Sequence, residues 1–236
     1  MKPSKQAFFN RYRENTIIEV VQALAKSSAG SQIAFKGGTA LKLFYDLPRF
    51  SEDIDYDSFS VVSPPALMDI IERVFFKKKW EITDRAIKYH TLLLELRFAG
   101  PDRNFRLKVE ISTRDKEIET TVLTLRGVPV LTLNPSYMMT EKLFAFVERQ
   151  AGRDLFDAWF ILKNGYPLDE PMIKRAYGDR ANLYKTMLNV IEKADAKKIH
   201  RDTGKLLEKD YRNWISTSFL SDFKRLIGIL SQEKCT

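Results

Sequence analysis

The sequence predicts an α/β fold of the α+β kind, in which a mixed-sheet domain precedes an all-helical domain. Two observations predict it. Alternating, β-branched segments separated by turn signals crowd residues 80–125, whereas segments with helical spacing fill the chain after Asn134-Pro135. The length of 236 residues and the 44% hydrophobic content are enough to bury two such cores. We therefore expect domains at residues 1–133 and 134–236.

The first domain is expected to begin with helices and strands in alternation. Apolar residues recur at helical spacing in residues 7–25, and a short apolar segment at 33–35 precedes a helix at 39–47 that a proline ends. Residues 51–59 alternate acidic and other residues, as a strand does. Ser63 is the expected N-cap of the next helix, because two prolines suited to a first helical turn follow it.

Four more strands and six more helices complete the expected elements. The strands are β-branched and alternating, and we expect an antiparallel or mixed sheet at residues 80–89, 91–100, 105–112 and 118–125. The helices carry apolar residues every three or four positions, and we expect them at residues 136–150, 154–163, 171–177, 181–193, 203–214 and 218–230.

The composition excludes several classes of protein. The single cysteine, Cys235, excludes a disulfide scaffold and a cysteine zinc site, and it fits a reducing cytoplasm. No apolar run is long enough to cross a membrane, and the charged N-terminus lacks the apolar core of a signal peptide. The net charge of +8 suits a polyanionic partner, although a solvated basic surface is an equally good interpretation of charge alone.

Acidic residues in the strand at 51–59 are the most informative anomaly. Residues two apart in a strand share a face, so Ser51, Asp53, Asp55 and Asp57 are expected to point the same way. Carboxylates gathered on one face repel each other, and a divalent cation such as Mg²⁺ is the natural compensation. Taken alone, the pattern fits a solvated edge strand equally well.

Other segments supply the remaining parts of a phosphate-handling site. Gly37 and Gly38 permit close backbone approach, and Thr39 adds a hydroxyl where a helix N-terminus attracts phosphate. Glu110 offers a third carboxylate from an alternating strand, and Lys142 lies on a later helix. Each segment alone also has an ordinary structural interpretation, as a turn, an exposed strand position or a solvated lysine.

The order of these segments indicates a site that polymerises nucleotides. The glycine turn would hold the triphosphate of an NTP, and Asp53, Asp55 and Glu110 would hold two Mg²⁺ ions, about 3.5–4 Å apart, that align the attacking and leaving oxygens. Lys142 would neutralise phosphate charge, because phosphoryl transfer depends mainly on positioning and electrostatics.

The segment KGGTALKLFYDLPRFSEDIDYD resembles the signature of the nucleotidyltransferase-like AbiEii toxins, which include the MenT toxins. Their first motif is a Gly-Gly-hydroxyl turn followed by R-x-S-x-D-x-D. The matching residues of the four motifs are Gly37, Gly38, Thr39, Arg49, Ser51, Asp53 and Asp55, then Lys108 and Glu110, then Lys142, and finally Arg153, Asp154 and Asp157.

The resemblance implies a polymerase-β-like nucleotidyltransferase fold with an added helical domain that completes the active site. It implies Mg²⁺-dependent transfer of a nucleotide from an NTP to an RNA acceptor, the 3′ end of tRNA in characterised relatives. It also implies a cognate antitoxin, with phosphorylation at the serine matching Ser51 as the means of control in some relatives. Thr39 stands where wider nucleotidyltransferases have serine.

Roles follow for each candidate residue, and three alternatives stay open. Asp53 and Asp55 are expected to hold metal, Glu110 to assist deprotonation, and Lys142 and Asp157 to complete the site. The residues expected to contact the nucleotide are Gly37, Gly38, Thr39, Ser51 and Lys142. The alternatives are transfer to a protein or small-molecule hydroxyl, transfer of the γ-phosphate, and a non-catalytic protein that binds nucleic acid or a partner.

Overall fold

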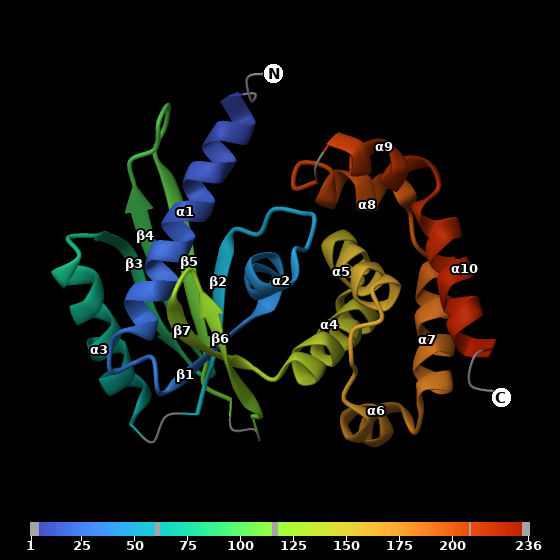
Figure 1. The fold of residues 1–236 in the computed structure, drawn as a ribbon, viewed down its shortest axis with the longest axis horizontal. Coiled ribbons are helices and arrows are strands. Elements are labelled where there is room, and N and C mark those ends of the chain that lie inside the picture. The colour runs from blue at the N-terminus through green and yellow to red at the C-terminus, as the bar shows by residue number, and fades with distance from the viewer. Residues whose placement is uncertain (1–4, 60–61, 115–117, 208, 233–236) are drawn as a thin grey trace. The chain divides into compact units, whose positions relative to one another are not determined.

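The structure, a computed structural model, describes residues 5–59, 62–114, 118–207 and 209–232, and Cys235 lies outside these ranges. The chain divides into two compact units (Figure 1). The sheet unit comprises Met1–Asp46 and Phe50–Leu133, and the helical unit comprises Leu47–Arg49 and Asn134–Thr236. Three residues from the N-terminal part of the sequence thus join the helical unit, which the sequence did not predict. The expected pair of separate domains stays a prediction.

A mixed sheet forms the centre of the sheet unit, as predicted, and it has seven strands. Its order is β3-β4-β5-β2-β1-β7-β6, which places β2 in the middle. β2 runs parallel to β5 and β1 runs parallel to β7, whereas the other neighbours are antiparallel. The strands are β1 (Ile33–Lys36), β2 (Asp53–Ser58), β3 (Glu81–Lys88), β4 (Thr91–Phe98), β5 (Phe105–Ser112), β6 (Thr120–Leu125) and β7 (Val128–Leu133).

Strand β7 was not among the predicted strands. Pro129 lies in it, and a proline removes one donor from a strand's hydrogen-bond ladder, which weakens the strand signal of this segment. The structure accommodates Pro129 near the hairpin turn, opposite Thr124 of β6, while β1 pairs with β7 further along, at Thr132. Gly127 takes a φ of +82° between the two strands, a conformation that glycine adopts without strain.

Three helices pack on this sheet: α1 (Lys5–Ala25), α2 (Gly37–Tyr45) and α3 (Pro64–Lys77). α1 packs against β7 and touches α3, which lies on β3, while α2 packs against β1 and β2. The expectation that Ser63 caps α3 was wrong in one respect, because its side chain makes no capping hydrogen bond. Prolines at the first two helical positions need no N–H partner, which lessens the need for a cap.

The helical unit contains α4 (Pro135–Arg149), α5 (Gly152–Lys163), α6 (Glu170–Tyr177), α7 (Arg180–Glu192), α8 (Ala196–Thr203), α9 (Lys209–Thr217) and α10 (Phe219–Gln232). α5 is its central element, since every residue from 154 to 162 is buried. α4, α8 and α10 pack around it. The described part of the chain contains no helix with the length and apolar character that crossing a membrane requires.

The predicted helix at 203–214 is confirmed from residue 209 onward, where α9 lies, but it was wrong at residues 204–207. α8, which the sequence did not predict, ends at Thr203, and the next helix begins only at Lys209. Between them Leu207 is buried and forms an isolated β-bridge with Arg49. A pairing between segments this far apart in sequence leaves no trace in local apolar spacing, which explains the error.

Candidate active site

Strand β2 presents Asp53 and Asp55 on its partly exposed face, as predicted for these two residues, whereas Asp57 is fully buried. Ile54 and Tyr56 are buried, whereas Asp53 and Asp55 are only partly buried. This alternation follows from the pleat, because successive side chains leave a strand on opposite faces. The two carboxylates therefore stand together at the middle of the sheet, two residues apart.

Strand β5 brings a third carboxylate beside them. In the parallel register of β2 and β5, Asp55 is the partner of Glu110 and Asp53 is the partner of Lys108. β5 alternates strictly, with its apolar residues buried and the Lys108–Glu110 face partly exposed. The structure therefore places Asp55 and Glu110 at the same height on adjacent strands, with Asp53 two residues before Asp55 on β2.

Lys108 is the cation of this acidic face, and the sequence had assigned it no role beyond a motif match. Its Nζ lies 2.8 Å from Oε1 of Glu110. The pKa of Lys108 is raised mainly by this hydrogen bond, against the opposing effect of burial, and the charges of Glu110, Asp53 and Asp55 raise it further. The three carboxylates thus create a negative field that holds a cation.

The chemistry of the donor set suits Mg²⁺, which prefers oxygen ligands and usually takes one or two carboxylates together with substrate phosphates. Asp53 and Asp55 supply that number. Within residues 5–59, 62–114, 118–207 and 209–232, no group of three or more Asp, Glu, His or Cys side chains is gathered closely enough to hold a metal. Glu110 would have to exchange Lys108 for the ion, so its role as a metal ligand stays a prediction.

Gly37 lies directly against this acidic face. It has a φ of +81°, and α2 begins at this residue. A Cβ atom at Gly37 would lie 2.5 Å from Oδ2 of Asp55. Only glycine therefore lets the helix begin in contact with the carboxylate, which is a stronger requirement than the turn that the sequence predicted.

The first turn of α2 follows at once and is suited to bind phosphate. Lys36 occupies the N-cap position but makes no side-chain capping bond, so this side chain does not occupy the first N–H groups of the helix. Gly38 and Thr39 are buried in that turn. The Thr39 hydroxyl donates a hydrogen bond to the carbonyl oxygen of Asp53, which ties the helix to the acidic strand.

Asp57, the third aspartate of β2, forms an ion pair with Lys36. Asp57 is fully buried, and Nζ of Lys36 lies 2.7 Å from its Oδ1. This pairing leaves Asp53 and Asp55 as the two aspartates of β2 at the partly exposed part of the face. Ser51 is partly buried and lies just before the strand. Contacts of Ser51, Gly38 and Thr39 with a nucleotide stay predictions.

The helical unit holds a second charged cluster, around Asp157 of α5. Arg49 donates two hydrogen bonds to this carboxylate, from Nε to Oδ1 at 2.6 Å and from Nη2 to Oδ2 at 2.7 Å. Nζ of Lys142, from α4, lies 3.0 Å from Oδ2 of Asp157 and 3.9 Å from Oδ1 of Asp154. Arg49 and Asp157 are 3% and 0% exposed, so this is a buried ion pair.

The protonation state of Asp157 follows from this geometry. Burial by itself raises the pKa of a carboxyl group, but the charges and hydrogen bonds of Arg49 and Lys142 outweigh it and lower the pKa of Asp157. The carboxylate is therefore ionised and held by two cations. The sequence identified Arg49 as a motif residue but gave it no function, and the structure identifies it as the main partner of Asp157.

The predicted site residues thus fall into two groups. Gly37, Gly38, Thr39, Ser51, Asp53, Asp55 and Glu110 belong to the sheet unit, and Lys142 and Asp157 belong to the helical unit. Catalytic roles for Lys142 and Asp157 stay predictions.

Comparison with solved structures shows a shared fold. JHP933 from Helicobacter pylori is similar over 99% of this chain and 98% of its own, with a TM-score of 0.58 and 21% identity. A second H. pylori protein, provisionally described as a nucleotidyltransferase, is similar over 97% of this chain and 99% of its own, with a TM-score of 0.58 and 22% identity. No curated protein matches the chain.

The family comparison is more specific than the fold. Residues 19–226 match the family model described as the nucleotidyl transferase AbiEii toxin of type IV toxin–antitoxin systems. This range includes both the acidic face of β2 and β5 and the Arg49–Asp157 cluster. Since the match covers most of the 236 residues, the protein belongs to the AbiEii family of nucleotidyltransferase toxins.

Proposed function

We propose that this nucleotidyltransferase moves an NMP group from an NTP to an RNA acceptor, the 3′ end of tRNA, with Mg²⁺ as its cofactor. The observation that carries the proposal is the meeting of three features in the sheet unit. Asp53 and Asp55 share one face of β2, Glu110 is the register partner of Asp55, and the N-terminus of α2 begins against the same carboxylate.

Different residues of the sheet unit bind the triphosphate, bind the metal and position the metal ligands. The first-turn N–H groups of α2 bind the triphosphate, because a helix N-terminus carries positive partial charge. Asp53 and Asp55 would hold the metal, and Thr39 fixes the Asp53 backbone through its hydrogen bond. When bound, Mg²⁺ would supply neutralisation of phosphate charge and alignment of the reacting oxygens.

The bonding changes are those of an in-line displacement. The acceptor hydroxyl oxygen forms a bond to the α-phosphorus, the bond between the α-phosphorus and the bridging oxygen breaks, and pyrophosphate leaves. The hydroxyl proton passes to a base, for which Glu110 is our candidate. Its ion pair with Lys108 gives that lysine the role of orienting the carboxylate.

Charge supports RNA as the acceptor. The chain carries a net +8, and a polyanionic acceptor gains affinity from such a charge in a salt-dependent way. The family also implies a cognate antitoxin as a partner, and we propose that the toxin acts on tRNA in the cytoplasm until such a partner inhibits it.

The experiment is a label-transfer assay. The purified protein is incubated with total tRNA, Mg²⁺ and each α-³²P-labelled NTP in turn, and labelled RNA is separated on a denaturing gel. Wild type should label tRNA in one or more reactions, whereas Asp53→Asn and an EDTA-treated sample should not. Asp84→Asn, which removes an exposed carboxylate from β3, is the matched control and should remain active.

Each other outcome points to a different function. Label on a protein or a small molecule would replace RNA as the acceptor. A parallel set of reactions uses γ-³²P-labelled NTPs, and label transferred only in that set would indicate a kinase. Full activity of Asp53→Asn would refute the assigned site, and absence of all transfer would favour a non-catalytic binding protein.

A further inference from the structure

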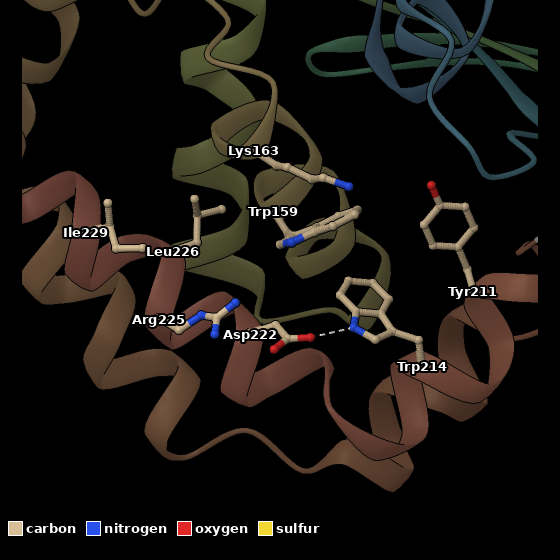
Figure 2. Close-up of a pocket in the computed structure, with 8 residues that line it drawn as sticks. All are labelled: Trp159, Lys163, Tyr211, Trp214, Asp222, Arg225, Leu226 and Ile229. Carbon is tan, nitrogen blue, oxygen red and sulfur yellow. Dashed lines mark hydrogen bonds between the residues drawn. The ribbon is translucent and has the colours of Figure 1, made fainter.

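A pocket of about 410 Å³ opens in the helical unit, within the size range of about 300–1,000 Å³ that is typical of ligand sites. Its lining residues come from α5, α9 and α10 (Figure 2). α5 supplies an aromatic ring and a lysine, α9 supplies two aromatic rings, and α10 supplies charged and aliphatic groups. The lining residues are Trp159, Lys163, Tyr211, Trp214, Asp222, Arg225, Leu226 and Ile229.

Three aromatic rings gather on one side of this pocket. The ring centroids of Trp159 and Trp214 lie 4.5 Å apart, and the Tyr211 ring lies 6.2 Å from Trp159 and 6.0 Å from Trp214. Trp159 is 6% exposed, so the core fixes its position. The indole Nε1 of Trp214 donates a 2.7 Å hydrogen bond to Asp222, which fixes the second ring (Figure 2).

Two cations accompany the rings. Nζ of Lys163 lies 4.7 Å from the centre of the Trp159 ring, and Lys163 and Arg225 are both exposed. Among the described residues, Arg225 has no carboxylate within ion-pair distance. Against the single negative charge of Asp222, the pocket therefore carries a net positive charge.

This combination selects the chemistry of the ligand. Aromatic rings bind bases by stacking, and nearby cations bind the phosphates of a single strand. A cationic ligand would meet like charge, because Lys163 already lies over the ring of Trp159. A purely apolar ligand would make no use of the two cations. A nucleotide uses the rings and the cations together.

We propose that this pocket binds an unpaired nucleotide of the RNA acceptor, with the base against the aromatic rings and a phosphate at Arg225 and Lys163. The RNA nature of the ligand rests on the proposed function, whereas the base-and-phosphate chemistry rests on the pocket itself. The pocket would add affinity and a preference for single-stranded RNA beyond what net charge provides.

Tryptophan fluorescence gives a direct test, because two of the chain's three tryptophans line the pocket. Trp80→Phe removes the third, which packs in the sheet unit against Phe75 and Phe98. The test titrates the Trp80→Phe protein with 5′-phosphorylated single-stranded hexaribonucleotides, with the matching RNA duplex and with the mononucleotides. The single strand should quench the emission saturably, and it should bind more tightly than the duplex or a mononucleotide.

Variants assign the binding to the pocket. Tyr211→Leu should lower the affinity for the single strand by about fivefold or more, because a stacking contact is lost. Arg225→Gln changes an exposed side chain, so the fold should be kept, and the negative slope of log affinity against log salt should become less steep by about 0.7. Lys185→Gln, an exposed charge on α7 outside the pocket, is the matched control and should change binding less than Arg225→Gln.

The outcomes separate this inference from the proposed function. An Asp53→Asn protein should fail in label transfer yet quench normally, because Asp53 belongs to the other unit. The pocket assignment would be overturned if the single strand caused no quenching, or if the duplex or a mononucleotide bound as tightly as the single strand. It would also be overturned if Tyr211→Leu and Arg225→Gln bound the single strand with the affinity of the parent Trp80→Phe protein. Label transfer would stand independently of those results.

Discussion

Arg49 and Asp157 show how one residue pair sets the chemistry of a core. Their charges are buried at 3% and 0% exposure, and removing one partner of such a pair leaves the other charge without compensation. The bidentate grip matters because the guanidinium plane matches the two carboxylate oxygens. Lys142 then adds a second cation to Oδ2.

Replacement of Asp157 should therefore destabilise the protein strongly. We expect Asp157→Ala to lower the free energy of unfolding by about 3–5 kcal/mol, since Arg49 and Lys142 lose their common anion. Urea denaturation followed by circular dichroism measures the change. Glu192→Gln, at an exposed position of α7, should change it by less than about 0.5 kcal/mol. Equal stability of the two variants would show that the buried pair contributes nothing.

The same pair gives the protein a defined response to acid. The folded-state pKa of Asp157 lies below its ordinary value of 3.8, so ionisation of this group stabilises the fold above that value. The contribution is lost as the pH falls from the ordinary value through the folded-state pKa. We expect the free energy of unfolding to fall more steeply for wild type than for Asp157→Asn below about pH 4. Parallel pH profiles from urea denaturation would contradict the assignment.

At the scale of elements, the junction of β1 and α2 is the critical feature. The helix begins at Gly37 immediately after Lys36, the last residue of the strand, and it meets the carboxylate of Asp55. The register of β2 with β5 then adds Glu110 beside Asp55. The site thus depends on the contact of a helix start with a strand centre.

A matched pair of glycine variants tests this junction. Gly37 and Gly127 have nearly the same φ, +81° and +82°, but an added Cβ meets Asp55 at Gly37 and nothing within 4 Å at Gly127. Both alanine variants should lose about 1–2 kcal/mol of stability from the left-handed conformation. Only Gly37→Ala should also lose nucleotide transfer and Mg²⁺-dependent thermal stabilisation. Retained transfer in Gly37→Ala would refute the importance of this contact.

At the scale of the whole molecule, the chain passes between the two units more than once. Leu47 is fully buried, and Arg49 is the main partner of Asp157, yet both precede β2 in the sequence. Arg49 also forms the β-bridge with Leu207. The helical unit is therefore built from two separate stretches of chain.

This arrangement predicts how fragments behave. A fragment of residues 134–236 lacks Leu47 and Arg49, so Lys142 is the one close cation that Asp157 keeps among the described residues. We expect this fragment to be less stable than the same region of the full chain, with weaker near-ultraviolet circular dichroism. Adding a synthetic peptide of residues 44–52 should restore part of the signal, whereas the peptide with Arg49→Gln should not. A fragment with the full signal would support independent folding of the expected domain.

The amino-acid sequence alone determined the secondary structure wherever local periodicity was strong, and it determined the motif that indicates nucleotide transfer. Asp53, Asp55 and Glu110 could be identified because strand alternation and spacing are local properties. The errors arose where a local pattern does not reveal the structure. Pro129 weakened the strand signal of β7, and the long-range bridge of Leu207 interrupted a pattern with helical spacing.

Only the tertiary structure decided which of these residues have partners. It paired Lys108 with Glu110, Lys36 with Asp57, and Arg49 with Asp157. It also gathered Trp159, Trp214 and Tyr211 from two helices into one pocket. Such pairings join residues whose neighbours are set by strand register and helix packing, which are long-range properties that no short stretch of sequence encodes.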